Sequence, residues 1–161
     1  MATRSTIALE FADGTIGQVY CHWDGYLAHN GKMLQEYYTN PFILRDLIDL
    51  GCLSSLRPQI GTKHPFAHYD VADMTLEQHS NLYRDMCTFY DRDRGERSSD
   101  ATYYNDYLHF LVDGQEEEYD YLLRNVNGKA TWFVSDHGGD FQLLTVALIE
   151  EILENVEVLP L

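Results

Sequence analysis

The chain has 161 residues, of which 45% are hydrophobic and 13% aromatic, and this composition indicates one folded domain over residues 1–161 and excludes a disordered acidic tail. It contains 11 Lys and Arg against 26 Asp and Glu, a formal net charge of -15 at pH 7. Such an excess of negative charge excludes nucleic-acid binding through neutralised phosphates and favours a partner with a basic surface.

The first predicted element is a β-hairpin over residues 7–21. Apolar residues alternate with others at its start, and an Asp-Gly pair ending at Gly14 follows. Alternation is typical of a strand with one buried face, and Asp-Gly is a preferred hairpin turn. The same two signals predict a second hairpin over 119–134, with an Asn-Gly pair ending at Gly128.

Helices are predicted where apolar residues recur at helical spacing next to capping residues. Asn40 and Pro41 form an N-cap with a first-turn proline, and Gly51 ends that helix. Thr75 and Gln78 form the pattern of a capping box. The predicted helices cover residues 31–38, 41–50, 75–86, 100–112 and 143–154.

The order of these elements predicts an α+β fold. We expect an antiparallel sheet built from the N-terminal and C-terminal hairpins, with about four to five helices packed on one face of it. Residues 53–73 mix polar, aromatic, Pro and Gly residues and are predicted as a long loop. Residues 87–90 are predicted as one more short strand.

The segment YCHWDGYLAHNG at residues 20–31 gathers the first candidate binding residues. Trp23 and Tyr26 can stack on a flat ligand, His22 can carry a proton, and Asp24 can orient it. In a second interpretation the segment is a strand-to-helix corner whose aromatic residues fill the core. The sequence leaves both interpretations open.

The segment DRDRGER at residues 91–97 provides the second set. Arg forks bind phosphates and carboxylates through paired hydrogen bonds, so Arg92 and Arg94 can hold an anionic ligand, such as a nucleotide, against Trp23. The alternative is an exposed loop whose charges neutralise one another, where each pair contributes ~0–1 kcal/mol.

The sequence indicates neither a metal nor a cofactor. Three widely spaced cysteines without a CxxC pair favour free thiols in a reducing compartment. No GxSxG motif occurs, and neighbours on a strand such as Cys21 and His22 point to opposite faces, so no catalytic residue is assigned. The residue types that metals prefer match no metal motif in their spacing. They are His22, Asp24, His29, Asp136, His137 and Asp140.

Three segments together resemble a family of small acidic proteins encoded by bacteriophages: STIALEFADGTIGQVYCHWDGYLAHNG, DRDRGE and EYDYLLRNVNGKATWFVSDHGG. The resemblance covers most of the chain outside residues 53–86. It implies a phage protein that acts in the host cytoplasm, and it implies no reaction. The start of the chain lacks the apolar run of a signal peptide, and no run reaches the ~20 apolar residues of a membrane span.

We therefore expect a non-enzymatic protein that binds and inhibits a host protein with a basic surface, such as a defence or nucleic-acid-handling enzyme. The alternative is a small-ligand module that sequesters or cleaves a nucleotide signal, with the His22 and Arg92 segments lining its pocket. Strand edges of the hairpins also offer a route to a homodimer. The expected partner contacts are Glu116, Glu117, Glu118, Asp120, Glu150, Glu151 and Glu154.

Overall fold

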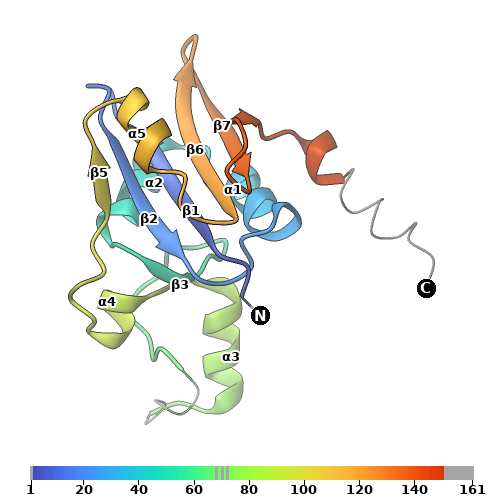
Figure 1. Cartoon of the computed structure of the whole chain (residues 1–161). Helices are drawn as coiled ribbons and strands as arrows, with labels where there is room; N and C mark the ends of the chain where they lie inside the picture. The colour runs from blue at the N-terminus through green and yellow to red at the C-terminus, as the bar shows by residue number, and fades with distance from the viewer. Residues whose placement is uncertain (1, 68, 70, 72, 151–161) are drawn as a thin grey trace.

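The computed structural model describes residues 2–67, 69, 71 and 73–150, and its centre is one eight-stranded, mostly antiparallel sheet (Figure 1). The strands are β1 (Ser5–Glu10), β2 (Ile16–Cys21), β3 (Leu53–Ser55), β4 (Thr88–Phe89), β5 (Thr102–Tyr104), β6 (Tyr119–Val126), β7 (Lys129–Asp136) and β8 (Gln142–Leu143). Their order across the sheet is β4-β3-β2-β1-β6-β7-β8, and β5 pairs with β2 outside this path. The predicted mixed fold is confirmed.

Both predicted hairpins are present. β1 and β2 pair antiparallel through a turn that contains Gly14 at φ 90°. β6 and β7 pair antiparallel through Asn127 at φ 54° and Gly128 at φ 85°, the two left-handed residues of a type I′ turn. The sheet is not wholly antiparallel, because the hairpins meet in parallel through β1 and β6, and β2 also pairs in parallel with β3.

Helices occur at all five predicted places, and three of them have nearly the predicted bounds. Their ends follow the expected capping, since the Asn40 side chain accepts a hydrogen bond from the backbone N–H of Phe42, and Thr75 with Gln78 closes a capping box. A π-helix precedes the first α-helix. The helices are η1 (Leu27–Gly31), α1 (Lys32–Tyr37), α2 (Pro41–Asp49), α3 (Leu76–Asp85), α4 (Tyr90–Arg94) and α5 (Tyr107–Asp113).

Two predicted segments are wrong in part. Residues 100–112 are not one helix, because Thr102–Tyr104 form β5 against β2, and Asp106 caps α5 by accepting from the backbone N–H of His109. Tyr103 and Tyr104 therefore belong to β5, and Tyr107 belongs to α5. The predicted loop at 53–73 also begins with a strand, β3, whose Leu53 is fully buried between β2 and β4.

The last predicted helix starts later than expected. Gln142 and Leu143 form β8 against β7, and residues 146–150 are helical. The Thr145 hydroxyl accepts a hydrogen bond from the backbone N–H of Leu148 at 3.0 Å, which is the position and role of an N-cap. The remainder of the predicted helix, 151–154, lies outside the described residues.

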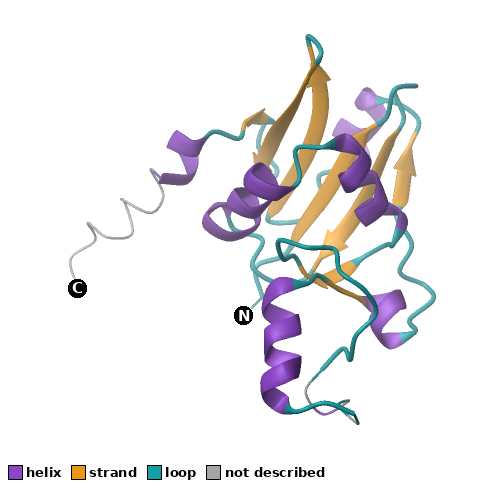
Figure 2. Cartoon of the chain, turned by 180° about the vertical axis from the view of Figure 1, so that it is seen from behind, coloured by secondary structure: helices purple, strands orange, loops and turns teal. Residues whose placement is uncertain are grey.

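Helices cover both faces of the sheet, where the sequence predicted one. α1 and α2 bury Leu34, Leu44 and Leu47 against one face of the sheet. This face is turned toward the viewer in Figure 2. α5 buries Phe110 against the other face, in front of the strands in Figure 1. Among the residues that the structure describes, no helix has the length and apolar character needed to cross a membrane.

Candidate functional site

The corner at residues 20–31 is held by close packing against the start of β1. Asp24 adopts a left-handed φ of 59°. A Cβ at Gly25 would lie 2.7 Å from the Cβ of Ser5 and 2.9 Å from the carbonyl oxygen of Thr3, so only glycine fits this turn. The Tyr121 hydroxyl donates to the Gly25 carbonyl at 2.7 Å and fixes it from the next strand.

The polar groups of the corner are mostly engaged with one another. The amide of Asn30, fully buried, donates to the Ser5 hydroxyl and to the Trp23 carbonyl, each at 3.2 Å. His22 places Nδ1 2.7 Å from the Tyr20 hydroxyl and its ring edge-on to Trp23. Trp23 remains 41% exposed, as does Tyr26. These contacts support the interpretation as a structural corner and leave two aromatic edges on the surface.

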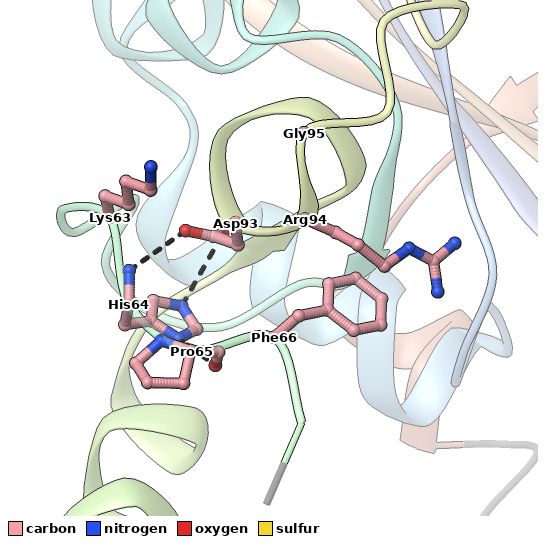
Figure 3. Close-up of a pocket in the computed structure, with 7 residues that line it drawn as sticks. All are labelled: Lys63, His64, Pro65, Phe66, Asp93, Arg94 and Gly95. Atoms are coloured by element: carbon pink, nitrogen blue, oxygen red, sulfur yellow. Dashed lines mark hydrogen bonds and ion pairs between the residues drawn. The ribbon is translucent and has the colours of Figure 1, made fainter. Parts of the chain in front are cut away.

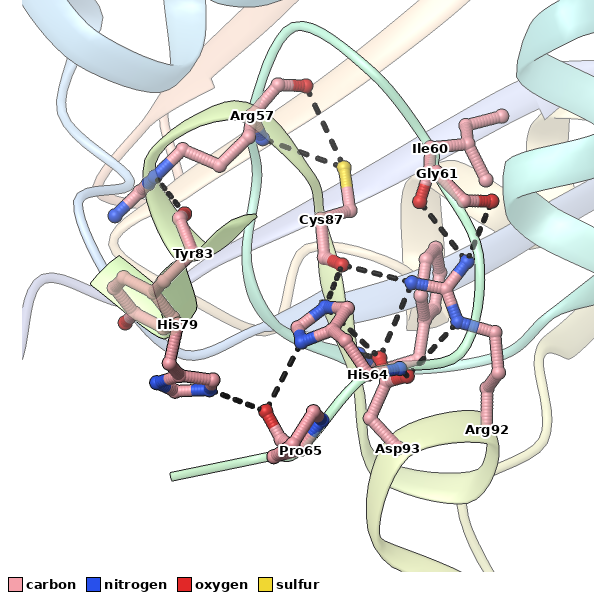
Figure 4. Close-up of polar contacts among 11 residues, drawn as sticks. Arg57, Ile60, Gly61, His64, Pro65, His79, Tyr83, Cys87, Arg92 and Asp93 are labelled. Atoms are coloured by element: carbon pink, nitrogen blue, oxygen red, sulfur yellow. Dashed lines mark hydrogen bonds and ion pairs between the residues drawn. The ribbon is translucent and has the colours of Figure 1, made fainter. Parts of the chain in front are cut away.

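Arg92 is committed to the fold (Figure 4). Its Nε donates to the Asp93 carboxylate at 3.1 Å, one Nη donates to the Ile60 carbonyl at 2.9 Å, and the other donates to the Cys87 carbonyl at 2.9 Å. Its side chain is 12% exposed. The guanidinium therefore connects residues 60–61 to the residues around β4, and it has no free pair of N–H donors for a ligand.

His64 and Asp93 form a pair of catalytic type, but both are enclosed (Figure 4). The Asp93 carboxylate accepts from the backbone N–H groups of Phe89 at 2.7 Å and His64 at 3.1 Å. The His64 ring has Nδ1 3.0 Å from the Pro65 carbonyl and Nε2 3.0 Å from the Cys87 carbonyl. A general base needs a free site within reach of a substrate proton, and this histidine has both nitrogens engaged.

The thiols are also unsuited to nucleophilic chemistry. Cys21, Cys52 and Cys87 are free cysteines. Burial raises the pKa of the Cys21 thiol to about 12, and burial likewise raises the pKa of Cys87 and of Cys52. A protonated thiol is a weak nucleophile and a poor metal ligand. Within the described part of the chain no group of three or more His, Cys, Asp or Glu side chains could hold a metal ion.

Arg94 lies apart from Arg92. Its guanidinium stacks 4.3 Å from the centre of the Phe66 ring and 5.1 Å from that of Tyr90, and it donates one hydrogen bond to Glu96 at 2.6 Å. No described hydrogen bond, ion pair or ring contact joins either arginine to His22, Trp23, Asp24 or Tyr26. These interactions therefore do not join the two arginines to the other four residues predicted to share a pocket with them.

A further candidate binding surface lies on α5 and the loop after it. Leu108 is 74% exposed and Val112 is 80% exposed, while Phe110 between them is fully buried in the core. Residues four apart share one face of a helix, so the two exposed side chains form an apolar pair that points away from the sheet. We call this pair, with Glu116, Glu117 and Glu118, the α5 surface.

The carboxylates of the α5 surface adjoin one another along the chain. Partial burial raises the pKa of Glu117, the charges of Glu116 and Glu118 add to the rise, and the charge of Arg4 opposes it. Glu118 also raises the pKa of Tyr119, after burial and the charge of Asp136. None of the three carboxylates forms a described ion pair, so the loop keeps an excess of negative charge over the nearby Arg4.

Asp120 is not part of that surface, which corrects its predicted role. It is fully buried, because its register on β6 turns it toward the α5 side, where the preceding loop covers it. It accepts from the Thr6 hydroxyl at 2.6 Å and from the backbone N–H of Glu117 at 3.3 Å. Burial raises its pKa to about 6. Glu150 is exposed, whereas Glu151 and Glu154 lie outside the described residues.

Sequence patterns did not single out Leu108 and Val112 as binding residues. One signal was present, since Leu108, Phe110 and Val112 follow one another at every second position of a short helix. Side chains two residues apart point about 200° from one another around a helix, so one side of this set has to face solvent.

Comparisons of the chain with protein-family models, with curated proteins and with solved structures found no match. The resemblance to phage proteins therefore stays a prediction. A function for the chain has to follow from its own surfaces, of which the α5 surface combines exposed apolar side chains with unpaired charge.

Proposed function

We propose that this chain is a non-enzymatic, phage-encoded protein that binds and inhibits a host protein with a basic surface, a defence or nucleic-acid-handling enzyme. The observation that supports the proposal is the α5 surface, where Leu108 and Val112 stand exposed on the helix and the loop after it carries Glu116, Glu117 and Glu118 without a described ion pair. Burying the apolar pair against a partner supplies binding free energy, while the carboxylates select a basic one.

Negative charge alone is a weak argument, because acidic residues also keep proteins soluble. The exposed apolar pair separates the two explanations, since a protein that needs only solubility gains nothing from placing Leu108 and Val112 in water. An apolar centre with a charged rim is the usual composition of a protein interface. Opposite charge also accelerates association and makes it dependent on salt.

The alternative function, a small-ligand module that sequesters or cleaves a nucleotide signal, keeps limited support. Of the residues predicted for it, Arg94 lines a cleft, while Arg92 is bound to carbonyl groups of the fold. The enclosed His64 ring and the buried thiols do not favour cleavage.

A capture experiment with matched variants tests the interaction. The wild type, L108S/V112S, E116Q/E118Q and D46N/D49N are immobilised separately, exposed to a bacterial lysate at low salt, and the retained proteins are quantified by mass spectrometry. D46N/D49N is the control, because it removes the same charge from exposed positions on α2, on the opposite face of the sheet. Unfolding curves establish that each variant is folded.

We expect a host protein with a basic surface to be retained by the wild type and by D46N/D49N. Retention by L108S/V112S and by E116Q/E118Q should fall by about tenfold, the effect of losing roughly 1.4 kcal/mol of binding free energy. Identical sets of retained proteins on all four columns would refute the proposal.

A further inference from the structure

A cleft that presents positively charged side chains, unlike the acidic α5 surface, lies between the segment that precedes α3 and the end of α4 (Figure 3). Its volume is about 620 Å³, within the range of sites for small organic ligands. Figure 3 shows Lys63 at one end, Arg94 at the other, and Pro65 and Phe66 along the wall between them. The lining residues are Lys63, His64, Pro65, Phe66, Asp93, Arg94 and Gly95.

The charges that a ligand would meet in this cleft are mainly positive. Asp93 is already compensated, because Arg92 and the backbone N–H groups of Phe89 and His64 donate to its carboxylate. Lys63 is exposed and forms no described ion pair or hydrogen bond. Two cationic side chains, Lys63 and Arg94, therefore line one cleft in a chain of net charge -15.

The Arg94 guanidinium is oriented by two aromatic rings in a way that suits a flat, anionic group. The Phe66 and Tyr90 rings, 5.6 Å apart, both contact its guanidinium and limit the rotation of its plane. Its one described hydrogen bond goes to Glu96, so further N–H donors remain free. A guanidinium stacked in this way can donate to a phosphate from its edge and stack on a base with its outer face.

The wall of the cleft is fixed from behind. The Pro65 carbonyl lies 2.6 Å from Nε2 of His79 on α3 and 3.0 Å from Nδ1 of His64. The backbone N–H of His64 donates to Asp93 on α4. These bonds anchor residues 63–66 to two helices, which sets the separation of Lys63 from Arg94.

We propose that this cleft binds a dinucleotide-sized organic anion with two separated monoanionic phosphates, one at Arg94 and one at Lys63. A single cation at each end matches one negative charge at each end, and Phe66 and Pro65 supply an apolar wall for the part of the ligand between them. Long nucleic acids are excluded, because the acidic remainder of the surface repels a polyanion. Glu96 competes with the ligand for Arg94.

The test is a titration of the isotope-labelled chain with cyclic diadenylate, which has two phosphodiester groups, and with AMP, which has one phosphate, at constant ionic strength. Amide chemical shifts of Lys63, His64, Phe66 and Gly95 report binding by NMR. The variants are K63Q, R94Q and E96Q. R97Q is the matched control, because Arg97 is exposed, forms no described ion pair and does not line the cleft.

We expect saturable shifts with cyclic diadenylate and at least about tenfold weaker binding of AMP, since a hydrogen-bonded charged group contributes roughly 1.5 kcal/mol or more. K63Q and R94Q should each weaken cyclic diadenylate by about the same factor, E96Q should strengthen it, and R97Q should leave it within about twofold. Absence of saturation with cyclic diadenylate, equal affinity for AMP, or equal losses in R94Q and R97Q would overturn the proposal. Partner capture by R94Q is expected to stay at the wild-type level, so the two proposals fail independently.

Discussion

Arg92 and Arg94 are two residues apart, yet the fold uses them in opposite ways. Arg92 is nearly enclosed and donates to the Asp93 carboxylate and to the carbonyls of Ile60 and Cys87. Arg94 is about half exposed and pairs with Glu96 on the surface. A buried charge that loses its partners is costly, whereas an exposed ion pair contributes little.

Arg92→Gln is therefore expected to lower the free energy of unfolding by about 3 kcal/mol, because Asp93 would stay buried without its main cationic partner. Arg94→Gln should lower it by less than about 1 kcal/mol. Urea unfolding of the two variants measures both values. Equal losses would mean that Arg92 is not the support for this region that its contacts indicate.

Asp120 should make stability depend on pH. Burial raises the pKa of this carboxyl from its ordinary 3.8 to about 6, so the folded state binds a proton that the unfolded state releases. Its contribution to stability is complete below about pH 4, falls as the pH rises toward 6, and is lost above that value. The full change is on the order of 3 kcal/mol.

Asp120→Asn removes this titration while keeping an oxygen for the Thr6 hydroxyl. The difference in melting temperature, wild type minus variant, should decrease from pH 4 to pH 6 and then level off. Thermal unfolding of both proteins at several pH values provides the measurement. Parallel curves over this interval would show that Asp120 titrates in the folded state as it does in the unfolded chain.

Among the secondary-structure elements, the corner between β2 and η1 depends on one close approach. The backbone of Gly25 does not have a left-handed φ. A larger residue is excluded there because a Cβ would lie within 3 Å of the Ser5 side chain and of the backbone of residues 3 and 4. Gly128, in contrast, has a left-handed φ of 85°, and no atom lies within 4 Å of the place where a Cβ would be.

Gly25→Ala is expected to lower the free energy of unfolding by about 2 kcal/mol through overpacking. Gly128→Ala should cost about 1 kcal/mol through backbone strain alone. Denaturant titrations compare the two variants. A Gly25→Ala protein as stable as the wild type would contradict the tight packing of this corner against β1.

The elements that the sequence predicts well are those with local causes. Gly14 and Gly128 mark tight turns, and Asn40 and Thr75 cap helices within a few residues of their own position. Strands β3 and β5 depend on β2, which lies at least 30 positions away, and three residues are too few to show a period. A homodimer through a sheet edge stays a prediction, with β8 pairing only two residues of β7.

The candidate sites divide in the same way. Glu116 and Arg94 were recognised because charge is visible in a sequence, and Asp120 was misplaced because charge says nothing about the face of a strand. Lys63 and Phe66 fell in a predicted loop without a pattern. They line one cleft with Arg94 because contacts with α3 and α4 hold the segment in place.

On the molecule as a whole, the two candidate surfaces differ in charge. The α5 surface presents exposed apolar side chains among carboxylates, and the cleft presents Lys63 and Arg94. A basic partner and a small anion would thus bind at different places on one domain, each excluded from the other site by repulsion.

The most direct test is the dissociation constant of the captured partner, measured for the wild type, E116Q/E118Q and D46N/D49N between about 50 and about 500 mM salt, because salt screens exposed charges. We predict that affinity for the wild type and D46N/D49N falls steeply with salt, and that E116Q/E118Q binds more weakly and with a shallower dependence. Affinity that is independent of salt, or the same dependence in E116Q/E118Q as in the wild type, would contradict the claim that the α5 surface carries the function.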